Sequence, residues 1–146
     1  MKKSMLILLC LIGYLLLTTI GCAEQTQSDT PKIDISSVVK EAFITDKGYT
    51  GELTKHMTED VFAKTNIYNT YPINDLKFKK PVQVDFSIRE VSQKRANDKL
   101  KVNMVYSVEI KDANNQLVGG SREIPISFTV QNSTTEWCIV AKEEKP

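Results

Sequence analysis

The sequence of 146 residues has only one histidine, one tryptophan and three cysteines. It contains no Ser/His/Asp set, no Cys–His pair, no cysteines at metal-binding spacing and no glycine-rich phosphate loop. These absences leave the chain without a catalytic signature. We therefore expect no metal or other cofactor.

A strong excess of charge of either sign is also lacking. The chain has 19 lysines and arginines against 18 aspartates and glutamates. Nucleic-acid binding needs a basic surface that displaces counterions from the phosphates. This composition makes no case for a nucleic-acid partner.

The N-terminus contains the most informative local pattern. Lys2 and Lys3 precede an apolar run over 5–20, and a small residue then precedes Cys22. That order is typical of a cleaved export signal. The segment Thr19-Ile20-Gly21-Cys22 resembles the bacterial lipobox, although Thr19 stands where leucine is usual.

The resemblance implies removal of residues 1–21 and attachment of a diacylglycerol to Cys22. The protein would then be anchored by lipid on the extracytoplasmic face of the cell membrane. An uncleaved signal anchor is the alternative, because the 18 residues from Met5 to Cys22 are at the lower limit for spanning a bilayer.

Processing at this site would leave 125 residues with a net charge of −1, enough for one domain. The polar segment 22–33 is predicted to be a linker, and 34–146 a single domain. Cys138 would be the one cysteine of that domain that is not lipidated, so no intramolecular disulfide is expected. Its apolar neighbours favour a buried, inert thiol over a reactive one.

The first part of the domain has the period of an α-helix. A helical stripe begins after Asp34, a suitable N-cap, and the element should end at Gly48. The stripe consists of Ile35, Val38, Val39, Ala42 and Phe43. A second helix is predicted over 50–57 and a third from Thr58, whose hydroxyl can cap it. Residues 66–72 are expected to form a loop.

Beyond Pro81 the apolar period changes to two, as in half-buried strands. An antiparallel meander is predicted with strands over 82–88, 100–110, 124–130 and 137–141. Pro125 implies an edge position or a bulge in the third strand. The inward positions are Val84, Phe86, Val102, Met104, Tyr106, Ile126, Phe128, Trp137 and Ile139. Since only Tyr106 and Trp137 bring polar atoms, the interior is predicted to be poorly equipped for acid–base chemistry.

Helices followed by long antiparallel strands, with Trp137 opening the last strand, resemble the NTF2-like (SnoaL-like) family over residues 34–142. The likeness is one of element order, without a signature motif. It implies an α+β fold in which N-terminal helices pack on a curved antiparallel sheet of about four strands, forming a cone. Small lipoproteins of this shape are common in Gram-positive bacteria. The family contains enzymes, transport factors and scaffolds, so the fold does not settle the function.

Three candidate sites follow. A cone lined by aromatic side chains could hold a small apolar ligand or lipid; these are Phe43, Tyr49, Phe86, Tyr106, Phe128 and Trp137. The outward sheet face could form a homodimer or dock an envelope protein; its residues are Asn103, Val105, Ser107, Ser127 and Thr129. An unbroken helix would align Glu52, His56 and Asp60 as an acid–base or metal site, but Thr58 is expected to break it.

The leading hypothesis is a membrane-tethered, non-enzymatic interaction or accessory module of the cell envelope. The alternative is a binding module for a small apolar ligand, and the remote alternative is an enzyme that uses His56 with Glu52 or Asp60.

Overall fold

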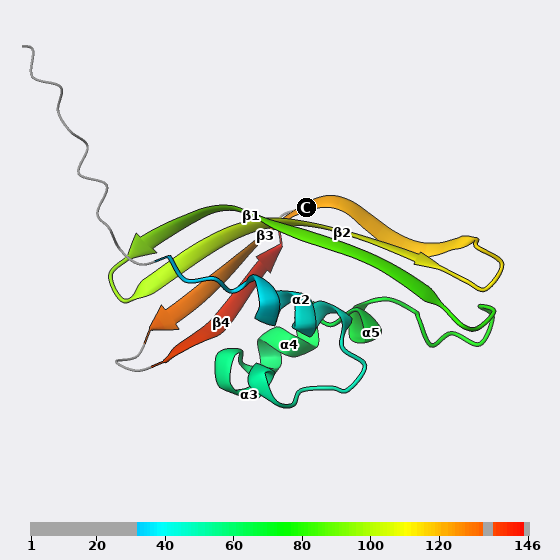
Figure 1. The fold of residues 1–146 in the computed structure, drawn as a ribbon, viewed down its shortest axis with the longest axis horizontal. Coiled ribbons are helices and arrows are strands. Elements are labelled where there is room, and N and C mark those ends of the chain that lie inside the picture. The colour runs from blue at the N-terminus through cyan, green and yellow to red at the C-terminus, as the bar shows by residue number, and fades with distance from the viewer. Residues whose placement is uncertain (1–31, 133–135, 145–146) are drawn as a thin grey trace, which may run out of the picture. The chain divides into compact units, whose positions relative to one another are not determined.

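The computed structural model describes residues 32–132 and 136–144, and these form four helices followed by a four-stranded antiparallel sheet (Figure 1). The helices are α2 (Ser36–Ile44), α3 (Glu52–His56), α4 (Glu59–Thr65) and α5 (Ile67–Thr70). The strands are β1 (Gln83–Ala96), β2 (Lys99–Lys111), β3 (Leu117–Asn132) and β4 (Trp137–Glu144). The expected α+β class with about four strands is confirmed.

The predicted signal peptide, Cys22 and most of the predicted linker lie outside the described residues. Of that linker, Lys32 and Ile33 are described and contact β1. Ile33 packs against the core, and its carbonyl accepts a hydrogen bond from Gln93 at 2.6 Å. The described fold thus begins at Lys32. None of the helices in the described ranges is long and apolar enough to cross a membrane.

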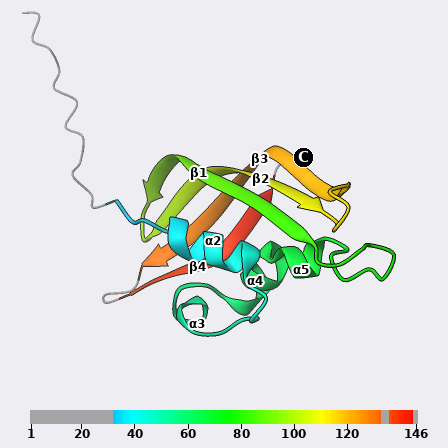
Figure 2. The same ribbon diagram turned by 45° about the vertical axis from the view of Figure 1, so that its right-hand side comes forward.

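All four helices lie on one face of the sheet (Figures 1 and 2). The predicted stripe of α2 is buried throughout, and α2 packs on β1 while α3 and α4 pack on β4. Two predicted details of these helices are wrong. The N-cap of α2 is Ile35, and Asp34 accepts a hydrogen bond from the Ser36 amide just outside it. The hydroxyl of Thr58 makes no capping bond, although Thr58 is the N-cap of α4.

The predicted loop over 66–72 contains the short helix α5, which the sequence analysis missed. Asn66 explains it. Its side-chain oxygen caps α5 by accepting from the Tyr68 amide, and its amide nitrogen donates to the carbonyls of Ala42 and Thr45 at 3.0 and 2.8 Å. One buried asparagine therefore satisfies polar groups at the end of α2 and at the start of α5.

The sheet has the order β1-β2-β3-β4, so each strand pairs with its neighbour in sequence. The predicted alternation in β2 is confirmed, because six residues at every second position are buried: Leu100, Val102, Met104, Tyr106, Val108 and Ile110. They face the helices and form the centre of the core. Both β1 and β3 extend well beyond their predicted bounds.

The third strand is irregular near Pro125 and at its glycines. Among the described residues, β4 pairs with β3 over Ile126–Asn132, and Pro125 lies just beyond this range while pairing with Val105 of β2. The β2–β3 register shifts between Tyr106 and Val108, and Glu123 in the bulge has a φ of 52°. Gly120 has a φ of 155°, and a Cβ there would lie 2.5 Å from the carbonyl oxygen of Val108.

Gly120→Ala should therefore lower the free energy of unfolding by about 1–3 kcal/mol, because the added methyl group would collide with the carbonyl of Val108, which is held in the sheet. Urea titration of the chain from residue 23 onwards measures this. Gly119→Ala is the matched control: its Cβ would meet side chains at 3.6 Å, an ordinary contact. Its effect should be within about 0.5 kcal/mol. Equal losses in the two variants would contradict the assigned close approach.

Candidate functional site

A bulge in β4 determines which of its side chains face the helices. Ile139 pairs with Val130, but Ala141 pairs with Thr129, so Val140 is an extra residue in the ladder. Beyond a bulge the side-chain alternation is inverted relative to the simple period. Lys142 and Glu144 accordingly pair with Phe128 and Ile126, whose side chains are in the core.

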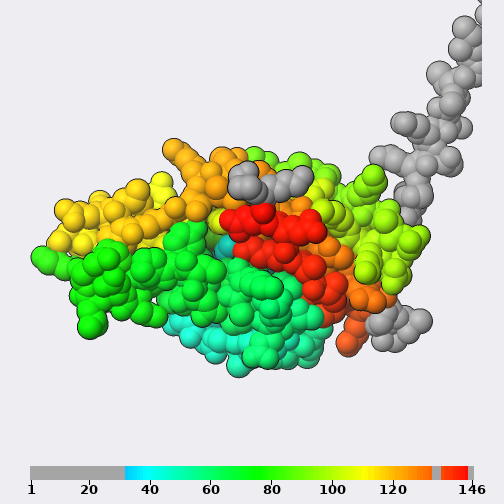
Figure 3. All heavy atoms as spheres, turned by 180° about the vertical axis from the view of Figure 1, so that it is seen from behind, coloured from blue at the N-terminus to red at the C-terminus, as the bar shows by residue number. Residues whose placement is uncertain are grey.

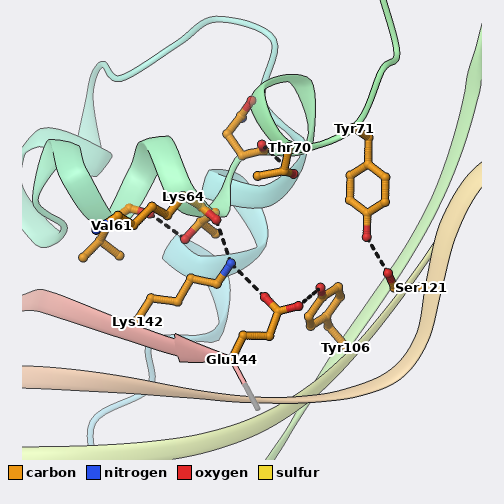
Figure 4. A network of polar contacts seen from close by, with 10 residues as sticks. Val61, Lys64, Thr70, Tyr71, Tyr106, Ser121, Lys142 and Glu144 are labelled. Carbon is orange, nitrogen blue, oxygen red and sulfur yellow. Dashed lines mark hydrogen bonds and ion pairs between the residues drawn. The ribbon is translucent and has the colours of Figure 1, made fainter. Parts of the chain in front are cut away.

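The prediction of an interior with no polar groups except those of Tyr106 and Trp137 is wrong for this reason. Lys142 and Glu144 form a network on the helix side of the sheet (Figure 4). The Lys142 ammonium lies 3.1 Å from a Glu144 carboxylate oxygen and donates to the carbonyl of Lys64 at 2.6 Å. The Tyr106 hydroxyl donates to the other Glu144 oxygen at 2.9 Å.

The two partners of the Lys142–Glu144 ion pair differ in burial. The Lys142 side chain is only 10% exposed, whereas that of Glu144 is 40% exposed. The ammonium also lies 5.8 Å from the centroid of the Phe43 ring, within range of a cation–π contact. Burial, and then the hydrogen bond to Glu144, raise the pKa of Tyr106 far above its usual value. Tyr106 is thus a neutral hydrogen-bond donor and is unsuited to act as a base.

The network lines an open cleft of about 380 Å³ between the helices and the sheet. Its walls are Phe43, Lys64, Thr65, Thr70, Tyr71, Tyr106, Lys142 and Glu144. The Tyr71 hydroxyl is 2.7 Å from that of Ser121 on β3 (Figure 4). Aromatic rings beside a paired ammonium and carboxylate can bind a small amphipathic molecule. They supply no activated nucleophile, because both charged groups are already paired.

The six aromatic residues predicted to line an apolar pocket do not surround one void. The Phe43 ring packs on Phe86 and Tyr106, with centroids 4.7 and 4.9 Å apart. Tyr49 packs on Phe62 at 5.6 Å, and Trp137 stacks on His56 at 4.3 Å. Phe128 is fully buried in the core. These rings fill the interior, and only Phe43 and Tyr106 reach the cleft.

His56 is brought together with Glu52 but not with Asp60. Its Nε2 lies 3.5 Å from a Glu52 oxygen, and its Nδ1 is 3.1 Å from the carbonyl oxygen of Trp137, to which it can donate. Asp60 is on the next helix and pairs with Lys64 at 2.7 Å. No group of three His, Cys, Asp or Glu side chains in the described ranges could hold a metal ion. His56 joins α3 to β4, which is a structural role.

The outward face of the sheet is left uncovered by the described helices (Figure 1). Its polar groups bond to one another: Asn103 accepts from the Ser127 hydroxyl and donates to that of Ser92, each at 2.9 Å. Ser127 is only 6% exposed as a result, while Val105 and Thr129 are half-buried. Ser107 accepts from the Glu123 amide in the β3 bulge. The predicted interface residues thus lie on one surface, and the polar side chains of Asn103, Ser107 and Ser127 have hydrogen-bond partners within the protein.

Cys138 lies on this outward face, opposite Gln131. It is half-buried, where the sequence predicted a buried thiol. Burial raises its pKa, which keeps it protonated and weakly nucleophilic.

Comparison with known proteins does not assign the chain to a family. A scan against protein-family models gives no match, and a search of curated proteins gives none either.

Tyr106→Phe should reduce the loss of stability at alkaline pH. Because the unfolded pKa of tyrosine is ~10 and folding raises that of Tyr106, the unfolded state releases this proton first. The bound proton of Tyr106 therefore contributes fully to the free energy of unfolding below pH ~10, and this contribution is lost as the pH rises above that value. Urea unfolding at neutral and at alkaline pH should show a smaller fall in Tyr106→Phe than in the parent chain.

At neutral pH the same variant should be less stable by about 1–3 kcal/mol, since the carboxylate of Glu144 loses a donor. Tyr68→Phe, at a half-buried position of α5, is the control and should show the full alkaline fall, because this variant retains Tyr106. Identical falls in all three chains would contradict the assigned role of the Tyr106 proton.

Proposed function

We propose that this chain is a lipid-anchored, extracytoplasmic protein whose NTF2-like domain serves as a non-enzymatic interaction module. The order of charged, apolar and small residues before Cys22 supports the anchor. The helices gathered on one face of a curved sheet support the cone (Figure 2). The packing of Phe43 on Phe86 and Tyr106 supports an interaction module over the alternative, a binding module for a small apolar ligand or lipid.

The observation that carries this proposal is the bare outward face of β1–β4. Three of its strands are 13 to 16 residues long, and none of the described helices covers their outward side (Figures 1 and 2). The five predicted interface residues have uncharged side chains, and the polar groups of Asn103, Ser107 and Ser127 are already hydrogen-bonded. Such a surface loses little solvation free energy when it is buried against a partner.

The occupant that fits this face is a second copy of the chain. Two sheets can pack face to face with their strands roughly aligned. The face is bordered by ion pairs of both signs, Lys101 with Glu143 at 2.7 Å and Arg89 with Glu123 at 2.8 Å. A twofold axis can place the cation of each pair near an anion of the other copy, which makes the surface self-complementary.

Sedimentation of residues 23–146 over a concentration series should show a reversible dimer. Val105→Arg places a bulky charge at the centre of the face and should weaken the dimer at least ~10-fold, by burying an unpaired cation. Ser37→Arg introduces the same residue on the exposed surface of α2 and should leave association unchanged. A monomer at every concentration, or equal effects of both variants, would overturn the homodimer.

The anchor is tested in intact cells by labelling with a palmitate analogue. The parent chain should carry the label in the membrane fraction, and Cys22→Ala should lose it completely and retain residues 1–21. Cys10→Ala, inside the segment predicted to be removed, is the control and should be labelled normally. Persistent labelling of Cys22→Ala would refute lipidation at that residue.

A further inference from the structure

Two segments that are far apart in the sequence meet at one end of the sheet. One is the loop of residues 72–81 between α5 and β1, and the other is the turn of residues 112–117 between β2 and β3; we call them together the tip. The Ala113 amide donates to the carbonyl of Lys79 at 2.9 Å, which joins them. The views in Figures 1 and 3 both show the loop and the hairpin side by side.

The tip exposes large apolar side chains. Leu76 is 98% exposed and Leu117 is 65% exposed, the highest values among the large hydrophobic residues that the structure describes. A single exposed leucine is ordinary on a protein surface. Leu76 and Leu117 lie on the two segments that the Ala113–Lys79 hydrogen bond joins, so this end of the sheet exposes two large apolar side chains.

The tip is also basic. The loop carries Lys77, Lys79 and Lys80 against Asp75, a net charge of +2, and Asp112 in the turn lowers the net charge of the whole tip to +1. Lys77 pairs with Asp75 at 2.9 Å, and the Lys80 ammonium donates to the carbonyl of Ile73. Lys79 is exposed, and its backbone is held by Ala113. By contrast the chain from Cys22 onwards has a net charge of −1.

We propose that the tip docks on an anionic lipid surface, with Leu76 and Leu117 entering the headgroup region and the lysines contacting lipid phosphates. Basic residues next to exposed apolar side chains are the combination that interfacial membrane binding uses. The positive charge of the loop is complementary to an anionic leaflet. This assignment rests on the proposed membrane location for its setting, but its chemistry does not involve Cys22.

The predicted tether is long enough for this contact. Lys32 pairs with Glu90 on β1, and the strand runs from there to Gln83 beside the tip, roughly 25 Å along its axis. Nine residues lie between Cys22 and Lys32, and the ten steps of the chain from one to the other reach up to ~35 Å. An anchored Cys22 therefore permits the tip to touch the same membrane.

The opposite end of the sheet provides a built-in control. Its hairpin, residues 94–99, carries Lys94, Arg95 and Lys99 against Asp98, again a net charge of +2. This hairpin has no large apolar side chain. Charge alone would attract this hairpin to an anionic membrane at least as strongly as the tip, whereas the proposed docking is specific to the tip.

The experiment uses residues 23–146, so that no lipid anchor contributes; every buried apolar residue described lies between Ile35 and Ile139, inside this segment. Binding is measured by co-sedimentation with vesicles of equal parts phosphatidylglycerol and phosphatidylcholine, and with pure phosphatidylcholine vesicles. The chain should bind the anionic vesicles, and added salt should weaken the binding. It should not bind the neutral vesicles measurably.

Lys79→Ser should lower the partition coefficient about fivefold, the factor that one lysine contributes at an anionic surface. Leu76→Ser should lower it by at least as much. Lys94→Ser should change it less than about twofold, because that hairpin lies at the far end. Since all three side chains are exposed, an unchanged midpoint of thermal unfolding would show that the fold is intact.

Absence of binding to the anionic vesicles would overturn the proposal, as would equal binding to neutral vesicles. So would a Lys94→Ser effect equal to that of Lys79→Ser, or no effect of Leu76→Ser, since either result would mean attraction by charge alone. Palmitate labelling of Cys22 in cells is read independently. Either of the two proposals can therefore fail without the other.

Discussion

The constraint on which the structure depends is the two-residue period of β2, because it makes one face of the sheet apolar along the whole strand. Every second residue from Leu100 to Ile110 is buried. A long strand with such a face must be covered, and the short helices α2 to α5 cover it with the stripe that begins at Ile35 and with α3 and α4. The helices are too short to be stable alone, so their burial against this face maintains them.

Bulges interrupt the two-residue side-chain period in β4 and β3, and they change which side chains face the helices. The extra residue Val140 inverts the alternation of β4 and turns Lys142 and Glu144 toward the helices, where Tyr106 and the carbonyl of Lys64 satisfy them. The bulge near Ser107 and the close approach at Gly120 bend β3 at the other end of the sheet. The cleft thus follows from local irregularities in an otherwise regular sheet.

Covering one face leaves two surfaces with distinct characters. The centre of the outward face is internally hydrogen-bonded, which suits another protein surface. The tip is basic and has exposed leucines, which suits lipid. The two do not overlap, since the interface residues lie in the middle of the strands and the tip lies at their end. A tethered domain could therefore contact the membrane and a second copy at the same time.

The sequence by itself determined the α+β class, the stripe of α2 and the alternation of β2, because these depend on the spacing of apolar residues. It also determined the outward position of Asn103, Val105 and Thr129, which follows from the same alternation. Only the tertiary structure decided the capping of α5 by Asn66, the inward turn of Lys142 and Glu144, and the meeting of the loop 72–81 with the turn between β2 and β3. Each of these depends on register and on contacts between distant residues, and a single bulge changes the side-chain direction of all the residues after it.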